Sequence, residues 1–447
     1  MFRISNLVTR FSNPTLRLAK GNTLEPTHRW NWGSKIVRVR CIFVALVPQL
    51  GHDFWQRAFL GCPLDVMKRF TLASFSLLYA LGQALGQAAE ITAAPADSWP
   101  MYRGTTSLTG LSKSKLSSSL KRLWAFKAEE GIHGTAAIAD SRVFVGCDDG
   151  KLYALDFKTG KQIWSFKTED IVESAPLVRD GKVYFGSSDC FVYALDAKDG
   201  KLLWKFETED RVLGAPNFFQ PKGKDAKPSL IVGSYDFKLY AFDPVTGKKN
   251  WEYETSNYIN GSPAVFSGRT AFGGCDALLH VIDLNAGKKQ KQIDAEAYII
   301  GSAAVVDDMA YIGHYENEFL CIDINGGKIA WKYKDRAFAY ASSPAVTKDR
   351  LVVGCRDKRL HCLDRKTGKR LWAFRTRGKV DSSPVIADGK VIVGADDGNL
   401  YVVSLEDGKK LWSYEIGEAV IAAPAVASGT IVIGAEDGRV YAFGSAK

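Results

Sequence analysis

From about residue 119 to the end of the chain, apolar and polar residues alternate in short runs with a period of two, which is typical of β-strands. KVYFGS (182–187) and FVYALD (191–196) are examples, and both are rich in β-branched and aromatic residues. Tight hairpin turns are predicted at three Asp-Gly pairs, at 149–150, 397–398 and 437–438. The pattern therefore predicts an all-β fold built from hairpins.

The strand pattern recurs with a period of about 40 residues. Each unit ends in a strand with a tryptophan, except one that has Lys291 there; these residues are Trp124, Trp164, Trp204, Trp251, Trp331, Trp372 and Trp412. Each unit also has a step of two small residues before a proline, at Pro176, Pro216, Pro263, Pro344, Pro384 and Pro424, with Ala136 and Ala303 in the two remaining units. A turn of the form Asp-x-x-x-Gly-Lys precedes most of the tryptophan strands. Eight copies of one unit result.

Each unit predicts four short strands, whose sheet would leave two apolar faces and two edges unpaired. Eight such sheets packed in a ring bury these faces, which predicts an eight-bladed β-propeller of four-stranded antiparallel blades. The last unit ends at Lys447 before its fourth strand, and the segment around Trp124 supplies a strand that no other unit uses. We therefore expect residues 119–447 to form one domain closed by an N-terminal strand, with residues 89–118 as a linker or strap.

The net charge of +10 lies mostly in the first part of the chain. Residues 1–66 hold nine Lys and Arg against three acids, and residues 67–88 add two cations, which leaves +2 for residues 89–447. The charge of the propeller therefore predicts no nucleic-acid partner. From Met67, a short cationic start, an apolar run of about twelve residues and small residues follow one another, as in a secretory signal peptide.

We interpret residues 67–88 as the signal peptide and residues 1–66 as an over-extended, disordered N-terminus. The apolar run is shorter than the ~20 residues that span a bilayer, so the protein is not expected to be integral in a membrane. No cysteine follows the run, so no lipid anchor is predicted. The expected location is the periplasm or the extracellular space.

The unit VYFGSSDCFVYALDAKDGKLLW (183–204) resembles the repeat of pyrroloquinoline-quinone-type eight-bladed propellers, and WPMYRG (99–104) resembles a segment that precedes such propellers. Two branches share this repeat. Quinoprotein alcohol dehydrogenases hold the quinone (PQQ) and Ca²⁺ in the central funnel, whereas the propeller factor of outer-membrane β-barrel assembly has no cofactor and binds a protein. A carbohydrate- or polymer-binding propeller is a third alternative.

The sequence favours the protein-binding branch. The dehydrogenases carry a vicinal cysteine pair, which this chain lacks. Ca²⁺ requires six to eight oxygen ligands at one point, and the position three residues before each proline, expected at the funnel mouth, offers suitable oxygens only at Glu173, Asn260 and Asp381. These three belong to separate blades. The prediction is therefore a non-catalytic, monomeric scaffold with an envelope protein as partner, no cofactor and no metal, with PQQ and Ca²⁺ as the alternative.

A second candidate site is a ring of acids, one in the second hairpin turn of every unit. Together with His133 at the funnel mouth they form the candidate binding face: Asp149, Asp189, Asp236, Asp276, Glu316, Asp357, Asp397 and Asp437. An acidic ring on one face could bind cations or a basic partner. The alternative is that the acid serves the turn itself, because Asp hydrogen-bonds readily to its own backbone.

Overall fold

The computed structural model describes residues 91–223 and 226–445. These residues form 33 strands. Among them there is no helix long and apolar enough to cross a membrane. The predicted over-extended segment 1–66 and signal peptide 67–88 lie outside the described residues.

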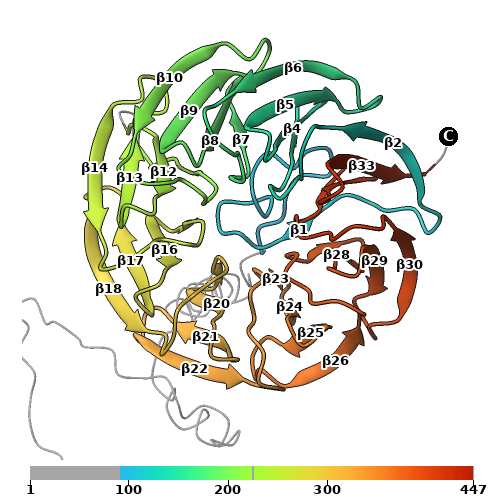
Figure 1. Ribbon diagram of the computed structural model, residues 1–447. Coiled ribbons are helices and arrows are strands. Elements are labelled where there is room, and N and C mark those ends of the chain that lie inside the picture. Colours follow the sequence, from blue (N-terminus) through green and yellow to red (C-terminus); the bar gives the residue numbers. More distant parts are fainter. Residues whose placement is uncertain (1–90, 224–225, 446–447) are drawn as a thin grey trace, which may run out of the picture. The chain divides into compact units, whose positions relative to one another are not determined.

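All strands except β1 form eight antiparallel four-stranded sheets, the blades, which follow one another around a ring (Figure 1). Blade 1 consists of β3 (Ala137–Ala139), β4 (Arg142–Gly146), β5 (Lys151–Asp156) and β6 (Gln162–Lys167), and blade 2 of β7 (Leu177–Arg179), β8 (Lys182–Gly186), β9 (Phe191–Asp196) and β10 (Leu202–Glu207). Blade 3 consists of β11 (Asn217–Phe219), β12 (Ser229–Gly233), β13 (Lys238–Phe242) and β14 (Lys249–Glu254), and blade 4 of β15 (Ala264–Phe266), β16 (Arg269–Gly273), β17 (Leu278–Asp283) and β18 (Lys288–Asp294). Blade 5 consists of β19 (Ala304–Val306), β20 (Met309–Gly313), β21 (Phe319–Asp323) and β22 (Lys328–Tyr333), and blade 6 of β23 (Ala345–Val346), β24 (Arg350–Cys355), β25 (Arg359–Asp364) and β26 (Arg370–Arg375). Blade 7 consists of β27 (Val385–Ala387), β28 (Lys390–Gly394), β29 (Asn399–Ser404) and β30 (Lys410–Glu415), and blade 8 of β31 (Ala425–Ala427), β32 (Thr430–Gly434), β33 (Arg439–Gly444) and β2 (Lys121–Lys127).

Blade 8 takes its outer strand from the front of the propeller sequence. β2 pairs antiparallel with β33, with Trp124 opposite Ala442, and completes the order β2-β33-β32-β31. The prediction of eight four-stranded blades closed by an N-terminal strand is therefore confirmed. Closure leaves no blade with an unpaired apolar face, because each sheet packs between two neighbours.

The two outer strands of every blade share a β-bulge at the tryptophan position. In blade 2, for example, the register shifts between Leu202 and Trp204, so that Leu203 is skipped. The same shift occurs in the other seven blades. A bulge re-aims the side chains that follow it, so Trp204 becomes buried while Leu203 remains 44% exposed. The bulge therefore explains most of the exposed leucines on the outer strands.

The tryptophans join each blade to the next one. Trp164 donates its indole N–H to Ala197 O of blade 2 at 3.2 Å and lies against Gly200, where an added Cβ would be 2.7 Å from the ring. Trp124, Trp204, Trp331 and Trp372 make the same hydrogen bond to the turn of the following blade. Lys291, which replaces the tryptophan in blade 4, donates to Asn325 O instead. The glycine of the Asp-x-x-x-Gly-Lys turn is therefore required by the neighbouring indole.

Residues 94–112 cross the ring as a strap, seen as the blue and cyan trace inside the blades in Figure 1. Strap carbonyls accept main-chain hydrogen bonds from the innermost strands or the turns that follow them, from Ile138, Val178, Val265, Val305, Val346, Ile386 and Ser428. In blade 3 the side chain of Asn217 makes this bond, donating to Thr106 O at 2.7 Å. The strap also contributes β1 (Leu111–Ser112), which lies parallel to β27. The strap thus makes hydrogen bonds to all eight blades and holds them in place around the central channel of the ring.

Arg103 of the strap is fully buried in the centre of the ring. Its guanidinium donates to the carbonyl oxygens of Ser383, Pro344 and Pro384. Burial lowers the pKa of Arg103 to about 10, and the nearby Tyr102 opposes this shift. The strap therefore closes one end of the channel with a cation held by backbone carbonyls.

Candidate functional site

The open end of the channel forms a funnel with a cavity of about 210 Å³. The eight positions three residues before the proline steps all line it: His133, Glu173, Leu213, Asn260, Ile300, Ala341, Asp381 and Ile421. Tyr102 of the strap lies at the bottom, where its hydroxyl bonds Ser343 Oγ at 3.0 Å. The funnel is therefore polar and ends at the strap.

A cluster of ionisable groups lies on one side of the funnel. His133 Nδ1 lies 2.9 Å from Asp148 Oδ2 and 3.9 Å from Glu173 Oε1, and His133 Nε2 lies 3.4 Å from Glu436 Oε1. The hydrogen bond to Asp148 raises the pKa of His133 to about 9, although burial opposes the shift. Burial, followed by the charge of Asp148, raises the pKa of Glu173. We name these four residues the His133 cluster.

Asp381 lies on the blade 7 side of the same funnel and already has two cationic partners. Arg356 Nε donates to both of its carboxylate oxygens, at 3.0 and 3.2 Å, and Lys379 Nζ lies 3.3 Å from Oδ2. Asn260, in blade 4, donates its amide to Cys275 Sγ and Ile299 O. Glu173, Asn260 and Asp381 thus line one cavity, but each is tied to its own neighbours. They do not fit the dense oxygen shell that Ca²⁺ requires.

The turn acids are held by hydrogen bonds within their own hairpins. Asp149 accepts the Tyr153 hydroxyl at 2.5 Å and the Lys151 backbone N–H at 2.9 Å. Tyrosine bonds the acid four residues earlier in the same way at Asp189, Asp236, Asp397 and Asp437. The side chains of Asp149, Asp276 and Asp357 are only 3%, 5% and 1% exposed, so these carboxylates point into the blade rather than outward. The geometry thus supports the role of the acid in its turn.

Two blades replace the tyrosine with histidine. His280 Nε2 lies 2.7 Å from Asp276, and His361 Nε2 lies 3.1 Å from Asp357. The remaining turn acid, Glu316, has Leu320 at the fourth following position and is exposed. The recurrence of Asp with Tyr or His four residues later was visible in the sequence and could have predicted that these acids are buried.

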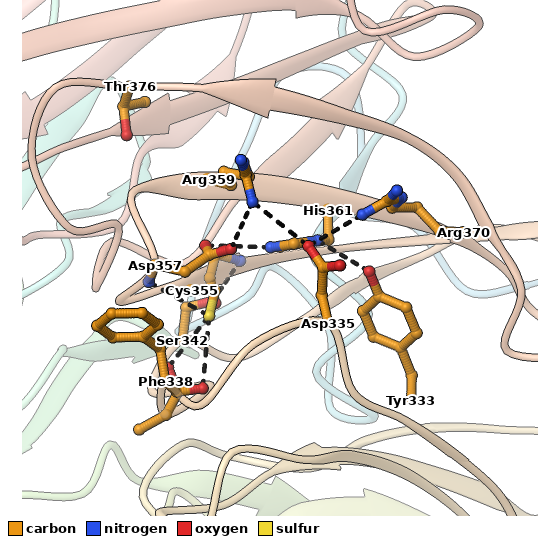
Figure 2. Close-up of polar contacts among 12 residues, drawn as sticks. Tyr333, Asp335, Phe338, Ser342, Cys355, Asp357, Arg359, His361, Arg370 and Thr376 are labelled. Atoms are coloured by element: carbon orange, nitrogen blue, oxygen red, sulfur yellow. Dashed lines mark hydrogen bonds and ion pairs between the residues drawn. The ribbon is translucent and has the colours of Figure 1, made fainter.

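Figure 2 shows the blade 6 version of this turn. Cys355, Asp357 and His361 are all buried and lie close enough to suggest a metal site. However, His361 Nδ1 lies 3.1 Å from the hydroxyl of Tyr333, while Nε2 faces Asp357. The Cys355 thiol donates to Phe338 O and Ala339 O, and burial raises its pKa. Every ligand atom therefore has a protein partner, and the group is structural.

A group of aromatic side chains is exposed around the funnel mouth in blades 4 to 6, and we name it the aromatic sector: Tyr258 (40% exposed), Tyr298 (54%), Tyr315 (48%) and Phe338 (46%). Tyr258 and Tyr298 each come two residues before a funnel-lining residue, and Tyr315 N donates to Tyr298 O at 3.1 Å. The sector is therefore on the same face of the ring as the funnel. Sequence analysis missed it, because only Tyr258 and Tyr298 share a position in their units, while Tyr315 and Phe338 occupy others.

The fold and the polar funnel place the chain among eight-bladed propellers of the pyrroloquinoline-quinone type. The family model described as outer membrane protein assembly factor BamB matches residues 117–333 and 335–446, and the chain belongs to this family. A search of curated protein sequences found no match.

Solved structures with the same fold come from both branches. BamB from Moraxella catarrhalis is 19% identical, covers 73% of this chain and 98% of its own, and has a TM-score of 0.62. Quinohemoprotein alcohol dehydrogenase from Comamonas testosteroni is 16% identical, covers 80% and 82%, and has a TM-score of 0.66. A europium-containing methanol dehydrogenase is 14% identical, covers 78% and 98%, and has a TM-score of 0.63. At these identities the likeness concerns the fold alone.

Proposed function

We propose that this protein is an exported, non-catalytic propeller that binds an envelope protein and takes part in outer-membrane protein assembly. Membership of the family described as an outer membrane protein assembly factor supports the proposal. The observation that carries it is the aromatic sector on the funnel face. Exposed tyrosine and phenylalanine are enriched at protein–protein interfaces, where a few such residues supply most of the binding free energy.

The funnel itself argues against a dehydrogenase. Its cavity of about 210 Å³ is below the ~300–1,000 Å³ that is usual for small-molecule sites. Asp381 is paired with Arg356 and Lys379, so its carboxylate is not available to a calcium ion without breaking two ion pairs. We therefore place the functional surface on the rim of the funnel rather than inside it.

The proposal is tested by first identifying the partner and then measuring its affinity. The purified protein is crosslinked in an envelope extract, the captured protein is identified, and binding is repeated with that protein in purified form. The double variant Tyr298→Ala/Tyr315→Ala should weaken binding at least tenfold, since loss of each central aromatic typically costs ~1–2 kcal/mol. Val245→Ala is the matched control, because Val245 is 65% exposed but lies on the turn between β13 and β14.

Outer-membrane protein levels provide the functional readout. A strain lacking the gene should have less folded outer-membrane protein, and the wild-type chain and the Val245→Ala variant should restore it, while the aromatic double variant should not. Equal rescue by the double variant would contradict the assignment of the binding face. Incubation with PQQ and Ca²⁺ tests the alternative, because a stoichiometric quinone absorbance with dye-linked alcohol oxidation would overturn the scaffold function.

A further inference from the structure

The His133 cluster brings together residues that are far apart in the sequence. His133 and Asp148 come from blade 1, Glu173 from the start of blade 2, and Glu436 from the β32–β33 turn of blade 8. One ligand atom from each of His133, Asp148 and Glu173 lies within 4.8 Å of the other two. The two distances from His133 Nδ1, 2.9 and 3.9 Å, bracket the ~3.3 Å between neighbouring ligands of a tetrahedral ion with bonds of ~2.0 Å.

The cluster has polar atoms with no hydrogen-bond partner. Asp148 Oδ1 is enclosed from solvent and makes no hydrogen bond, and His133 Nε2, which is also enclosed, has only the 3.4 Å contact with Glu436 Oε1. Buried polar atoms in proteins are normally satisfied. The comparable group in blade 6 obeys this rule, since both ring nitrogens of His361 have partners. Of the two groups of His, Cys, Asp and Glu in the described residues that could surround an ion, only the His133 cluster has a carboxylate oxygen without a hydrogen-bond partner, Asp148 Oδ1.

The cluster also has an excess of negative charge. Three carboxylates surround one imidazole, and among the described residues none of the three forms an ion pair with Lys or Arg. This differs from Asp381 and Asp396 across the funnel, both of which are paired with Lys379. Like charges that are close together repel, so a bound divalent cation would stabilise this arrangement.

We propose that His133, Asp148 and Glu173 bind one divalent transition-metal ion of the zinc class at the funnel mouth, and that Glu436 positions the imidazole from its other nitrogen. An imidazole with two carboxylates suits such an ion, whereas Ca²⁺ prefers six to eight oxygens. A carboxylate on the second nitrogen of a metal-bound histidine is a common orienting contact. Three protein ligands leave a coordination position open toward the funnel. The proposal does not depend on the proposed assembly function.

Binding is tested with Co²⁺ and Zn²⁺ on the purified propeller after treatment with a chelator. Calorimetry should show one saturable Zn²⁺ site, and Co²⁺ should give visible absorption bands without the near-ultraviolet band of a cobalt–thiolate bond. His133→Ala should weaken Zn²⁺ binding at least 100-fold, because it removes the only nitrogen ligand. Glu436→Gln should weaken it about 10- to 100-fold, as is typical for loss of an orienting contact.

Glu316→Gln is the matched control, because Glu316 is an exposed acid on the equivalent turn of blade 5 and is outside the cluster. It should leave Zn²⁺ affinity unchanged, and all variants should melt cooperatively. Four results would each overturn the proposal: no saturable site, unchanged affinity in His133→Ala, a cobalt–thiolate band, or Ca²⁺ binding as tightly as Zn²⁺. Because the readout is metal affinity, failure here would leave the assembly function standing.

Discussion

At the scale of single residues, two residues of the same type in the same kind of backbone conformation can have different roles, because their neighbours differ. Gly408 and Gly389 illustrate this point. Both have left-handed backbones, with φ of +71° and +70°. A Cβ on Gly408 would lie 2.6 Å from Trp372, whereas a Cβ on Gly389 would meet nothing within 4 Å.

Gly408→Ala is therefore expected to destabilise the protein more than Gly389→Ala. Each substitution costs ~1–2 kcal/mol for an alanine at positive φ, and Gly408→Ala costs a further ~1–3 kcal/mol because the indole must move. Chemical denaturation of the two variants measures the difference. Equal free energies of unfolding would show that the tryptophan contact does not constrain the turn.

The titration of His133 is a second residue-scale prediction. In metal-free protein, its carbon-bound ring protons should titrate by NMR with a midpoint near pH 9, because of the hydrogen bond to Asp148, with Glu173 and Glu436 also facing the ring. A pKa raised above the unfolded value stabilises the fold fully below about pH 6.5, and this contribution is lost as pH rises through 9. Asp148→Asn should move the midpoint down toward 6.5, and Glu316→Gln should leave it unchanged. A midpoint near 6.5 in the wild type would contradict the geometry.

At the scale of elements, the blades could be predicted from the sequence but the route of the strap could not. Each blade repeats one hydrophobic pattern eight times, so strand order and ring closure follow from counting. The strap has no sequence repeat, and its carbonyls accept hydrogen bonds from backbone N–H groups that are spread along the chain from Ile138 to Ser428, 290 residues apart. The His133 cluster was missed for a similar reason. The sequence places Asp148 next to a turn acid, but only the ring brings blade 8 beside blade 1.

Arg103 provides the test of the strap. Arg103→Met should destabilise the propeller by ~2–5 kcal/mol, because the carbonyls of Ser383, Pro344 and Pro384 lose their donor in a buried site. Arg122→Met is the control, since Arg122 is exposed and its guanidinium donates to Tyr414 Oη. Thermal unfolding should show a clear decrease for the first variant and little change for the second. Equal melting temperatures would show that the buried guanidinium does not hold the strap in place.

At the scale of the whole molecule, stability depends on closing the ring. A chain starting at residue 119 lacks the strap but retains β2, whereas a chain starting at residue 129 lacks both. The first should still unfold in one cooperative transition at a lower temperature. The second exposes an edge of β33 and the face of blade 8, so we expect its unfolding transition to broaden. Equally sharp transitions at the same temperature in both chains would contradict a closed ring.

The pairing of β2 with β33 also bears on how the chain reaches its native state. β2 is synthesised before every other strand of the blades, but its partner β33 is synthesised last. Contacts between distant parts of a chain form slowly because a large loop must close first. Until they form, β33 offers an open edge that could pair with another molecule. Newly made protein is therefore most prone to aggregation just before its two ends meet, and a chaperone that shields this edge would raise the yield of native protein.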